Sequence, residues 1–154
     1  MGVSTYQKDD AMKTTQTKII DFFENLSPEL SLKEYTQIYA HDVYFKDPFN
    51  ETIGVEQVYA IFGDMYQTLH NPRFRVIEYI ENDGVVYLKW EFLFALTSDA
   101  VEQSFTGVSR LAISEGHIKS HVDYWDAGEH VYAKIPLLGW LIGKVKKRIS
   151  HAKD

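Results

Sequence analysis

Apolar residues recur at helical spacing in three segments of the first half of the chain. This spacing predicts helices over about residues 12–25, 31–39 and 54–69. Ser31 and Glu34 stand three residues apart at the start of the second segment, which is the pattern of a capping box. The apolar stripe of the third segment consists of Val58, Phe62, Met65, Tyr66 and Leu69.

The second half of the chain shows strand patterns separated by turn signals such as Asn82-Asp83-Gly84 and Glu115-Gly116. A short alternating segment at 42–47 adds one earlier strand. The order of helices followed by an antiparallel meander predicts an α+β fold. Because the strands are long, we expect a strongly curved antiparallel sheet, with the three helices on its concave face enclosing a cone-shaped cavity. The predicted strands of the meander are 73–81, 85–97, 102–114 and 117–125.

The composition favours one globular domain, over residues 12–126, after a disordered leader at 1–11. An aromatic content of 14% supplies large apolar side chains that can line a cavity. The net charge of −6 argues against nucleic-acid binding. The chain has no cysteine, which excludes disulfides and thiolate catalysis. Without an apolar run of ~18 residues, a cytoplasmic protein is the expectation.

Residues 127–154 form a separate C-terminal extension in this interpretation. Apolar residues around Trp140 precede five Lys/Arg from Lys144 onward, where the local charge is +4 and the rest of the chain carries −10. One interpretation is a segment that packs across the cavity mouth or against a partner subunit. The other is an interfacial segment that binds a membrane surface.

The final predicted strand carries the strongest candidate for chemistry. Alternate residues of a strand share a face, so His121, Asp123 and Trp125 point one way, and Val122 and Tyr124 the other. If the first set faces inward, a titratable pair lies beside an aromatic wall. Burying a carboxylate is costly unless it is paired or functional, so this strand predicts a ligand or reaction chamber.

A second candidate carboxylate is Asp47, which precedes Pro48 at the end of the first strand. Asp-Pro also starts turns, in which the Asp side chain binds nearby backbone N–H groups. Asp123 has its own structural alternative, a salt bridge with Arg110 across the sheet. Both carboxylates therefore remain candidates for a pocket role and for a purely structural one.

His121 is either a general base next to Asp123 or Asp47, or a satisfied core histidine. A metal site would need a further ligand such as His130, and no such residue has convincing spacing. We therefore expect neither a metal nor a cofactor.

Three segments carry a resemblance to a known family: Y-A-H-D-V-Y-F-K-D-P-F at 39–49, G-V-E-Q-V-Y-A-I-F at 54–62 and H-V-D-Y-W-D at 121–126. Over about residues 12–126 the chain resembles the nuclear transport factor 2-like superfamily, and within it the bacterial SnoaL-like proteins. The resemblance implies an α+β cone that is commonly dimeric through its sheet. Members include ketosteroid isomerases, polyketide cyclases, limonene epoxide hydrolase, scytalone dehydratase and binders without enzymatic activity, so function remains open.

In ketosteroid isomerases an Asp-Pro after the first strand supplies the general base, and Asp47 matches it. The resemblance places the oxyanion-hole tyrosine at Phe23, the oxyanion-hole aspartic acid at Gly107 and a supporting tyrosine at Phe62. None of these residues has a side-chain donor, which removes a large catalytic contribution. Steroid isomerase activity of that kind is therefore not expected.

Limonene epoxide hydrolase suggests another arrangement, with Asp123 matching an aspartate of its final strand. Its charged pair on a neighbouring strand resembles Lys89 and Glu91. Trp90 lies between them and belongs to the apolar face of that strand. If Trp90 faces inward, this arrangement fails.

These observations lead to two hypotheses. The first is a small enzyme that binds an apolar or cyclic molecule and performs cofactor-free acid–base chemistry with Asp47, His121 and Asp123. The second is a binding or interaction module without chemistry. In either case we expect a homodimer through the outer face of the sheet, at Tyr87, Val108, Val122 and Tyr124. The side chains expected to contact the ligand are Phe23, Phe62, Tyr66, Trp90 and Trp125.

Overall fold

The structure of the chain, a computed structural model, describes residues 5–127, with side chains described from residue 14 onward. Its three helices are α1 (Thr5–Glu24), α2 (Leu32–Ile38) and α3 (Val55–Thr68). The first helix begins at Thr5 rather than at residue 12, so the predicted leader is helical from that point. No Pro or Gly lies between Thr5 and the apolar stripe, so no residue in this stretch interrupts the helix. Of the predicted extension, residues 128–154 lie outside the described residues.

The second helix is capped as the sequence predicts. The Glu34 carboxylate accepts hydrogen bonds from the backbone N–H of Ser31 and from its hydroxyl, at 2.5 and 2.7 Å. These contacts close the capping box at the helix start. The helix ends where β1 (Tyr39–Lys46) begins, so the strand starts three residues earlier than residue 42.

Six strands form one mixed sheet in the order β2-β1-β6-β5-β4-β3. The meander consists of β3 (His70–Asn82), β4 (Val85–Ala95), β5 (Gln103–Ser114) and β6 (His117–Tyr124), and its pairings are antiparallel as predicted. The hairpin partner of β1, β2 (Glu51–Ile53), is too short to show an alternating pattern and was not expected. The sheet also differs from an all-antiparallel one in that β1 pairs with β6 in parallel.

The parallel pair β1–β6 has a fixed register near its C-terminal end. Phe45 is opposite His121, and Lys46 is opposite Val122. Neighbouring parallel strands present opposed residues to the same side of the sheet. This pairing brings the ends of the first and last strands together, although they are far apart in the sequence.

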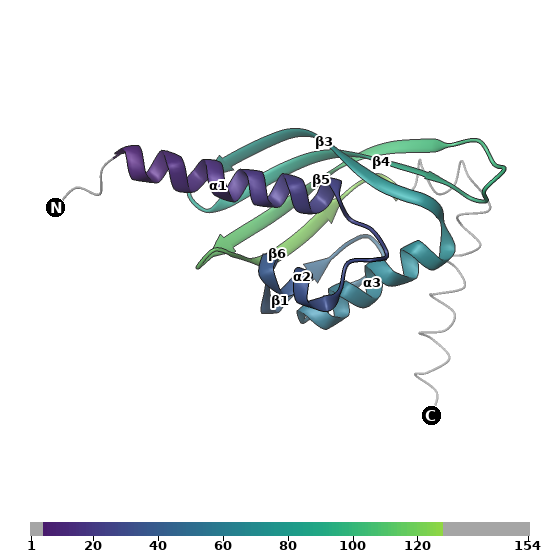
Figure 1. Cartoon of the computed structure of the whole chain (residues 1–154), viewed down its shortest axis with the longest axis horizontal. Helices are drawn as coiled ribbons and strands as arrows, with labels where there is room; N and C mark the ends of the chain where they lie inside the picture. The colour runs from purple at the N-terminus through teal and green to yellow at the C-terminus, as the bar shows by residue number, and fades with distance from the viewer. Residues whose placement is uncertain (1–4, 128–154) are drawn as a thin grey trace, which may run out of the picture.

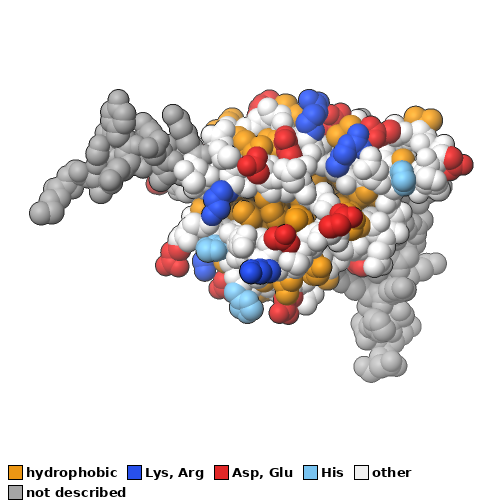
Figure 2. Space-filling model, in the orientation of Figure 1, with side chains coloured by type: hydrophobic (Ala, Val, Ile, Leu, Met, Phe, Trp, Pro, Cys, Tyr) orange, Lys and Arg blue, Asp and Glu red, His pale blue; other side chains and the backbone are white. Residues whose placement is uncertain are grey.

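The curved sheet remains open and carries the helices on its concave side (Figure 1). Helix α1 lies along the long strands, while α2 and α3 lie beside β1. On the face seen in Figure 2, acidic and basic side chains surround a band of hydrophobic ones. No helix within residues 5–127 has the length and apolar character needed to cross a membrane. The core includes Phe22, Tyr35, Val43, Val58, Leu88, Phe94, Leu111 and Ile118.

Candidate functional site

A cavity of about 120 Å³ lies between α3 and the concave face of the sheet. Apart from two carboxylates and one amide, its walls are apolar. The carboxylates belong to Asp47 and Asp123, and the amide to Asn50. The apolar lining consists of Phe45, Phe49, Ile61, Phe62, Met65, Leu69, Phe74, Trp90, Phe92, Phe105 and Trp125.

Asp47 and Asp123 line the same cavity because of the parallel register of β1 and β6. They directly follow Lys46 and Val122, the last opposed pair, and therefore point to the same side of the sheet. Both carboxylates also line a more open groove on the other side, of about 620 Å³. The two acids therefore stand at the boundary between the inner cavity and the outer groove.

The Asp47 carboxylate is held by the turn that follows it. Oδ1 accepts hydrogen bonds from the backbone N–H groups of Phe49 and Asn50, at 2.7 and 2.6 Å. The Asn50 side-chain amide donates to Oδ1 at 3.0 Å and to Oδ2 at 2.9 Å. Burial raises the pKa of Asp47 above its ordinary value, and the nearby charge of Asp123 adds to the rise, whereas the bonds from Asn50 and Phe49 oppose it. Asp47 therefore both binds the backbone of its own turn and lines the cavity.

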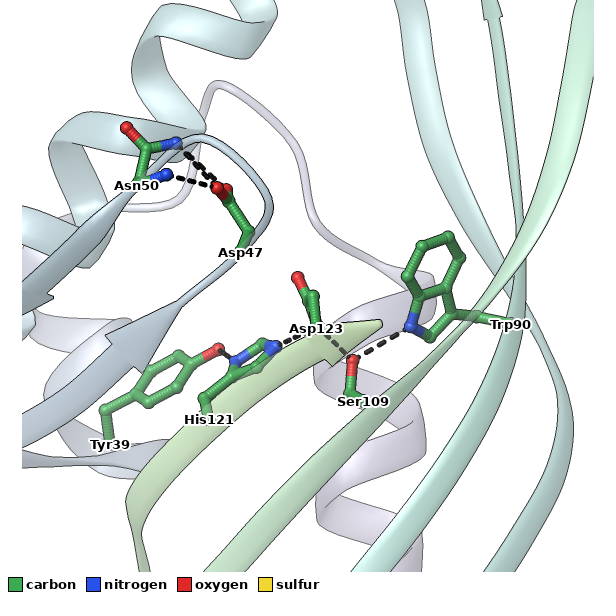
Figure 3. Close-up of polar contacts among 7 residues, drawn as sticks. All are labelled: Tyr39, Asp47, Asn50, Trp90, Ser109, His121 and Asp123. Carbon is green, nitrogen blue, oxygen red and sulfur yellow. Dashed lines mark hydrogen bonds and ion pairs between the residues drawn. The ribbon is translucent and has the colours of Figure 1, made fainter. Parts of the chain in front are cut away.

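Asp123 accepts two hydrogen bonds on the same oxygen. His121 Nε2 lies 2.6 Å from Oδ1, and the Ser109 hydroxyl donates to Oδ1 at 2.5 Å. In Figure 3 the other carboxylate oxygen points away from these two groups, toward the strand end that carries Asp47. The alternative prediction of a salt bridge between Asp123 and Arg110 is wrong, because Arg110 is opposite Val122 and lies on the outer face of the sheet.

His121 is fully buried, with 1% of its surface exposed, and does not line the main cavity. Its Nδ1 lies 2.8 Å from the hydroxyl of Tyr39. The imidazole packs edge-on against Phe23 and Phe45, and it stacks parallel to Tyr39. With both ring nitrogens engaged, His121 is satisfied within the core.

Trp90 faces inward and connects to the same polar group. Its indole Nε1–H donates to the Ser109 hydroxyl at 2.8 Å. The ring covers Gly107 on the next strand, where a Cβ would lie 2.3 Å from the Cη2 atom of the indole. Trp90 also lines a second chamber of about 10 Å³, which Phe23, Ser109 and His121 help to enclose.

The remaining predicted contact residues divide between these spaces. Phe62 lines both the cavity and the inner chamber, and Phe23 lines the chamber alone. Trp125 packs on Phe49 and Phe105, with ring centroids 5.4 and 4.9 Å apart. Tyr66 is not among the lining residues, and its burial raises the pKa of its hydroxyl to about 12.

The arrangement suggested by limonene epoxide hydrolase does not form. Trp90 faces inward, so Lys89 and Glu91 lie on the outer face of the sheet. There Lys89 pairs with Glu78 at 3.3 Å, and Glu91 pairs with Arg75 at 2.6 Å. Neither charge reaches the cavity.

Sequence reasoning missed three polar residues of the site: Asn50 and Ser109, which bind the carboxylates, and Tyr39, which binds His121. Ser109 gave a signal, because it is a hydroxyl at an inward position of a strand whose other fully buried residues are apolar or Gly. Asn50 follows Asp47 by three residues, as in many Asx turns. Tyr39 gave none, since its partner is 82 positions away. Among residues 5–127 no three His, Cys, Asp or Glu side chains are placed to hold a metal, and His130 lies beyond that range.

Comparison with known proteins agrees with this architecture. A structure of a Catenulispora acidiphila protein of ketosteroid isomerase-like fold, in complex with trimethylamine, has a TM-score of 0.61 at 14% identity, over 72% of this chain and 84% of that one. A Jannaschia sp. protein named as a candidate SnoaL-like polyketide cyclase has a TM-score of 0.65 at 9% identity, over 74% of this chain and 86% of that one. A nuclear transport factor 2-like protein of unknown function from Burkholderia pseudomallei has a TM-score of 0.65 at 15% identity, over 78% and 94%.

These identities are low, so the structural likeness concerns the fold alone. A search of curated proteins found no match. The model of one sequence family, described as the SnoaL-like domain, matches residues 19–121, which is most of the chain. Together with the three helices on the curved mixed sheet, this match shows that the chain belongs to the SnoaL-like domain family.

Proposed function

We propose that the protein binds a small, largely apolar molecule in the cavity and transfers protons to and from it through Asp47 and Asp123, without a cofactor. The observation that carries this proposal is the pair of carboxylates, one directly after β1 and one in the adjacent parallel strand β6, in a cavity whose other walls are apolar except for Asn50. Carboxylates are seldom placed in such walls unless they have a role there.

The two acids differ in a way that suits a division of labour. Asp47 lies where burial raises its pKa, so it is the better group to hold a proton and return it to the ligand. Asp123 presents Oδ2 to the cavity as the atom that accepts the proton, because Oδ1 already accepts hydrogen bonds from His121 and Ser109. The reaction would be an isomerisation, cyclisation or water addition in which one acid takes a proton and the other gives one.

The substrate is limited by what the cavity lacks. Phe23, Phe62 and Gly107 supply no side-chain donor for a developing oxyanion. The absence of donors at these positions suits a substrate that delocalises the negative charge within itself, as in an extended enol, or a reaction that needs only an activated water. A polyketide-like compound meets the first condition.

The size of the cavity adds a second limit. Its volume of about 120 Å³ is below the ~300–1,000 Å³ typical of pockets for drug-sized ligands. A ligand would be small, or would extend past Asp47 and Asp123 into the outer groove. The Catenulispora acidiphila neighbour binds trimethylamine, a molecule of suitable size, so small amines belong in a ligand screen beside ketones, epoxides and lactones.

The experiment begins with that screen, read out by thermal stabilisation and turnover. Asp123→Asn and Asp47→Asn should each lower the turnover of the best substrate by about 100- to 10,000-fold. Asp42→Asn is the matched control, because Asp42 is an exposed carboxylate of the same strand β1, paired with Lys119 at 3.3 Å. Unchanged turnover in both cavity variants would refute acid–base catalysis.

A non-catalytic binding module is the second candidate. The observation in its favour is that Asp47 accepts four hydrogen bonds from its own turn, which gives this acid a structural purpose. In that case a ligand would stabilise the protein, and no member of its chemical class would be turned over.

We further propose a homodimer through the outer face of the sheet. Tyr87 and Tyr124 are exposed there by 46% and 59%, and Val108 and Val122 are half-buried on the same face, with Arg110 opposite both Tyr87 and Val122. Such apolar area on one sheet face is typical of an interface. Light scattering at micromolar concentration should give the dimer mass, and Tyr124→Lys should shift it toward the monomer. A monomeric wild-type protein would contradict this proposal.

A further inference from the structure

We propose that His121 is a positioning residue and not the base: it carries its proton on Nε2, accepts a hydrogen bond from Tyr39 on Nδ1, and holds Asp123 so that Oδ2 faces the cavity. The geometric part of this inference stands alone, and only its catalytic consequence rests on the proposed function.

The argument starts at the buried hydroxyl of Tyr39. This residue is only 1% exposed, and within the described part of the chain its hydroxyl is placed to hydrogen-bond with His121 Nδ1 alone, at 2.8 Å. Burial raises the pKa of Tyr39 well above its ordinary value, so the phenol keeps its hydrogen. A buried O–H without an acceptor is costly, and therefore it donates to Nδ1.

This donation fixes the proton of the imidazole. Nδ1 must present its lone pair to Tyr39, so the ring hydrogen resides on Nε2. Nε2 in turn lies 2.6 Å from Asp123 Oδ1, which accepts that hydrogen. If both ring nitrogens carried hydrogens, Nδ1 would donate to Tyr39, and the phenol hydrogen would be left without an acceptor in the core.

The other side of Asp123 is fixed in the same way. An indole N–H can only donate, so Trp90 Nε1 donates to the Ser109 oxygen at 2.8 Å. The Ser109 hydrogen is then free to point at Asp123 Oδ1. Two buried donor chains, one from Tyr39 and one from Trp90, thus converge on a single carboxylate oxygen (Figure 3).

This convergence assigns different roles to His121 and Asp123. Both nitrogens of His121 are engaged, and the ring lines only the inner chamber, so it cannot take a proton from a ligand in the main cavity. Asp123 reaches that cavity and keeps Oδ2 clear of both donors. The pair therefore works in the reverse of the usual order, in which a carboxylate orients a histidine base.

The first test needs no substrate. Nitrogen NMR of the histidine rings in the wild-type protein should show His121 with hydrogen on Nε2 and a hydrogen-bonded, unprotonated Nδ1. In Tyr39→Phe the hydrogen should stay on Nε2, while the Nδ1 resonance moves toward that of a nitrogen without a hydrogen bond. A hydrogen on Nδ1, alone or together with Nε2, would overturn the proposal.

The second test separates positioning from proton transfer. His121→Gln places an amide donor near Asp123 but offers no basic nitrogen, so turnover should stay within about tenfold of wild type, while loss of a general base costs 100- to 10,000-fold. His121→Phe removes the donor and should reduce kcat more than His121→Gln does. A loss in His121→Gln as large as in Asp123→Asn would make His121 the base. If the NMR result holds but Asp123→Asn remains fully active, the proposed function fails while the hydrogen-bond assignment stands.

Discussion

Trp90 and Gly107 are opposed residues of β4 and β5, and the indole ring of Trp90 occupies the space in which a side chain at position 107 would stand. Position 107 is where the resemblance to ketosteroid isomerases places the oxyanion-hole acid. Gly107 supplies no side-chain donor, and the space that a side chain there would occupy is filled by Trp90. The N–H of this tryptophan donates to Ser109. The inner part of the cone is thus closed by Trp90 instead of being left open for a larger ligand.

We expect Gly107→Ala to destabilise the protein by about 1–3 kcal/mol, the usual cost of overpacking a filled core. The added Cβ would lie 2.3 Å from Cη2 and 2.6 Å from Cζ2 of Trp90, so the indole must move and strain its bond to Ser109. Urea unfolding of the variant and the wild type measures the difference.

Gly63→Ala is the matched control for that substitution. Gly63 lies within α3, and apart from its two chain neighbours and the nearby helix backbone no atom comes within 4 Å of a Cβ built there. Alanine favours a helix over glycine, so this variant should be unchanged or more stable by roughly 0.5–1 kcal/mol. Equal effects of the two substitutions would show that Trp90 does not hold the position seen in the structure.

Ser109→Ala should cost about 1–3 kcal/mol, although it removes only one oxygen atom. The hydroxyl is buried, accepts from Trp90 and donates to Asp123, so its loss leaves a buried N–H without an acceptor. Ser114→Ala, at an exposed position of the same strand, should stay within about 0.5 kcal/mol of wild type. Similar unfolding midpoints for the two variants would refute the energetic importance of this link.

The sequence was informative wherever function depends on spacing within one element. Strand alternation placed His121 and Asp123 on the inward face, and the structure agrees. It also assigned Trp90 to the apolar face of its strand, and the inward position of Trp90 in the structure excludes the arrangement of Lys89 and Glu91. The helical stripe of α3 predicted Phe62 in the cavity wall, while its neighbour Tyr66 lies outside that wall.

The sequence was less informative wherever a contact joins distant elements. The shared cavity position of Asp47 and Asp123 depends on the parallel pairing of β1 with β6, which no local pattern encodes. The contact between Tyr39 and His121 depends on the same pairing and on the bulge between Tyr39 and Tyr44. The assignment of His121 as a candidate base came from its residue type, whereas its engaged nitrogens became visible only when the strands were assembled.

The last prediction concerns how stability depends on pH at Asp47. Burial raises the pKa of this acid in the folded protein above the value of 3.8 that it has when unfolded. The folded state therefore binds the proton more tightly, and the resulting stabilisation is fully present below pH 3.8 and is lost as pH rises through the folded pKa. Asp47→Asn removes this titration and leaves the other groups in place.

The free energy of unfolding of wild type minus that of Asp47→Asn should consequently fall as pH rises above 3.8, and then become constant. Asp42→Asn should show the opposite slope, because the ion pair with Lys119 lowers the pKa of Asp42, and its contribution is lost as pH falls. Urea unfolding of the three proteins at a series of pH values measures both differences. A difference for Asp47→Asn that rises with pH would mean that the hydrogen bonds from Phe49 and Asn50 outweigh burial, and Asp47 would then lose its proposed role as the group that holds the proton.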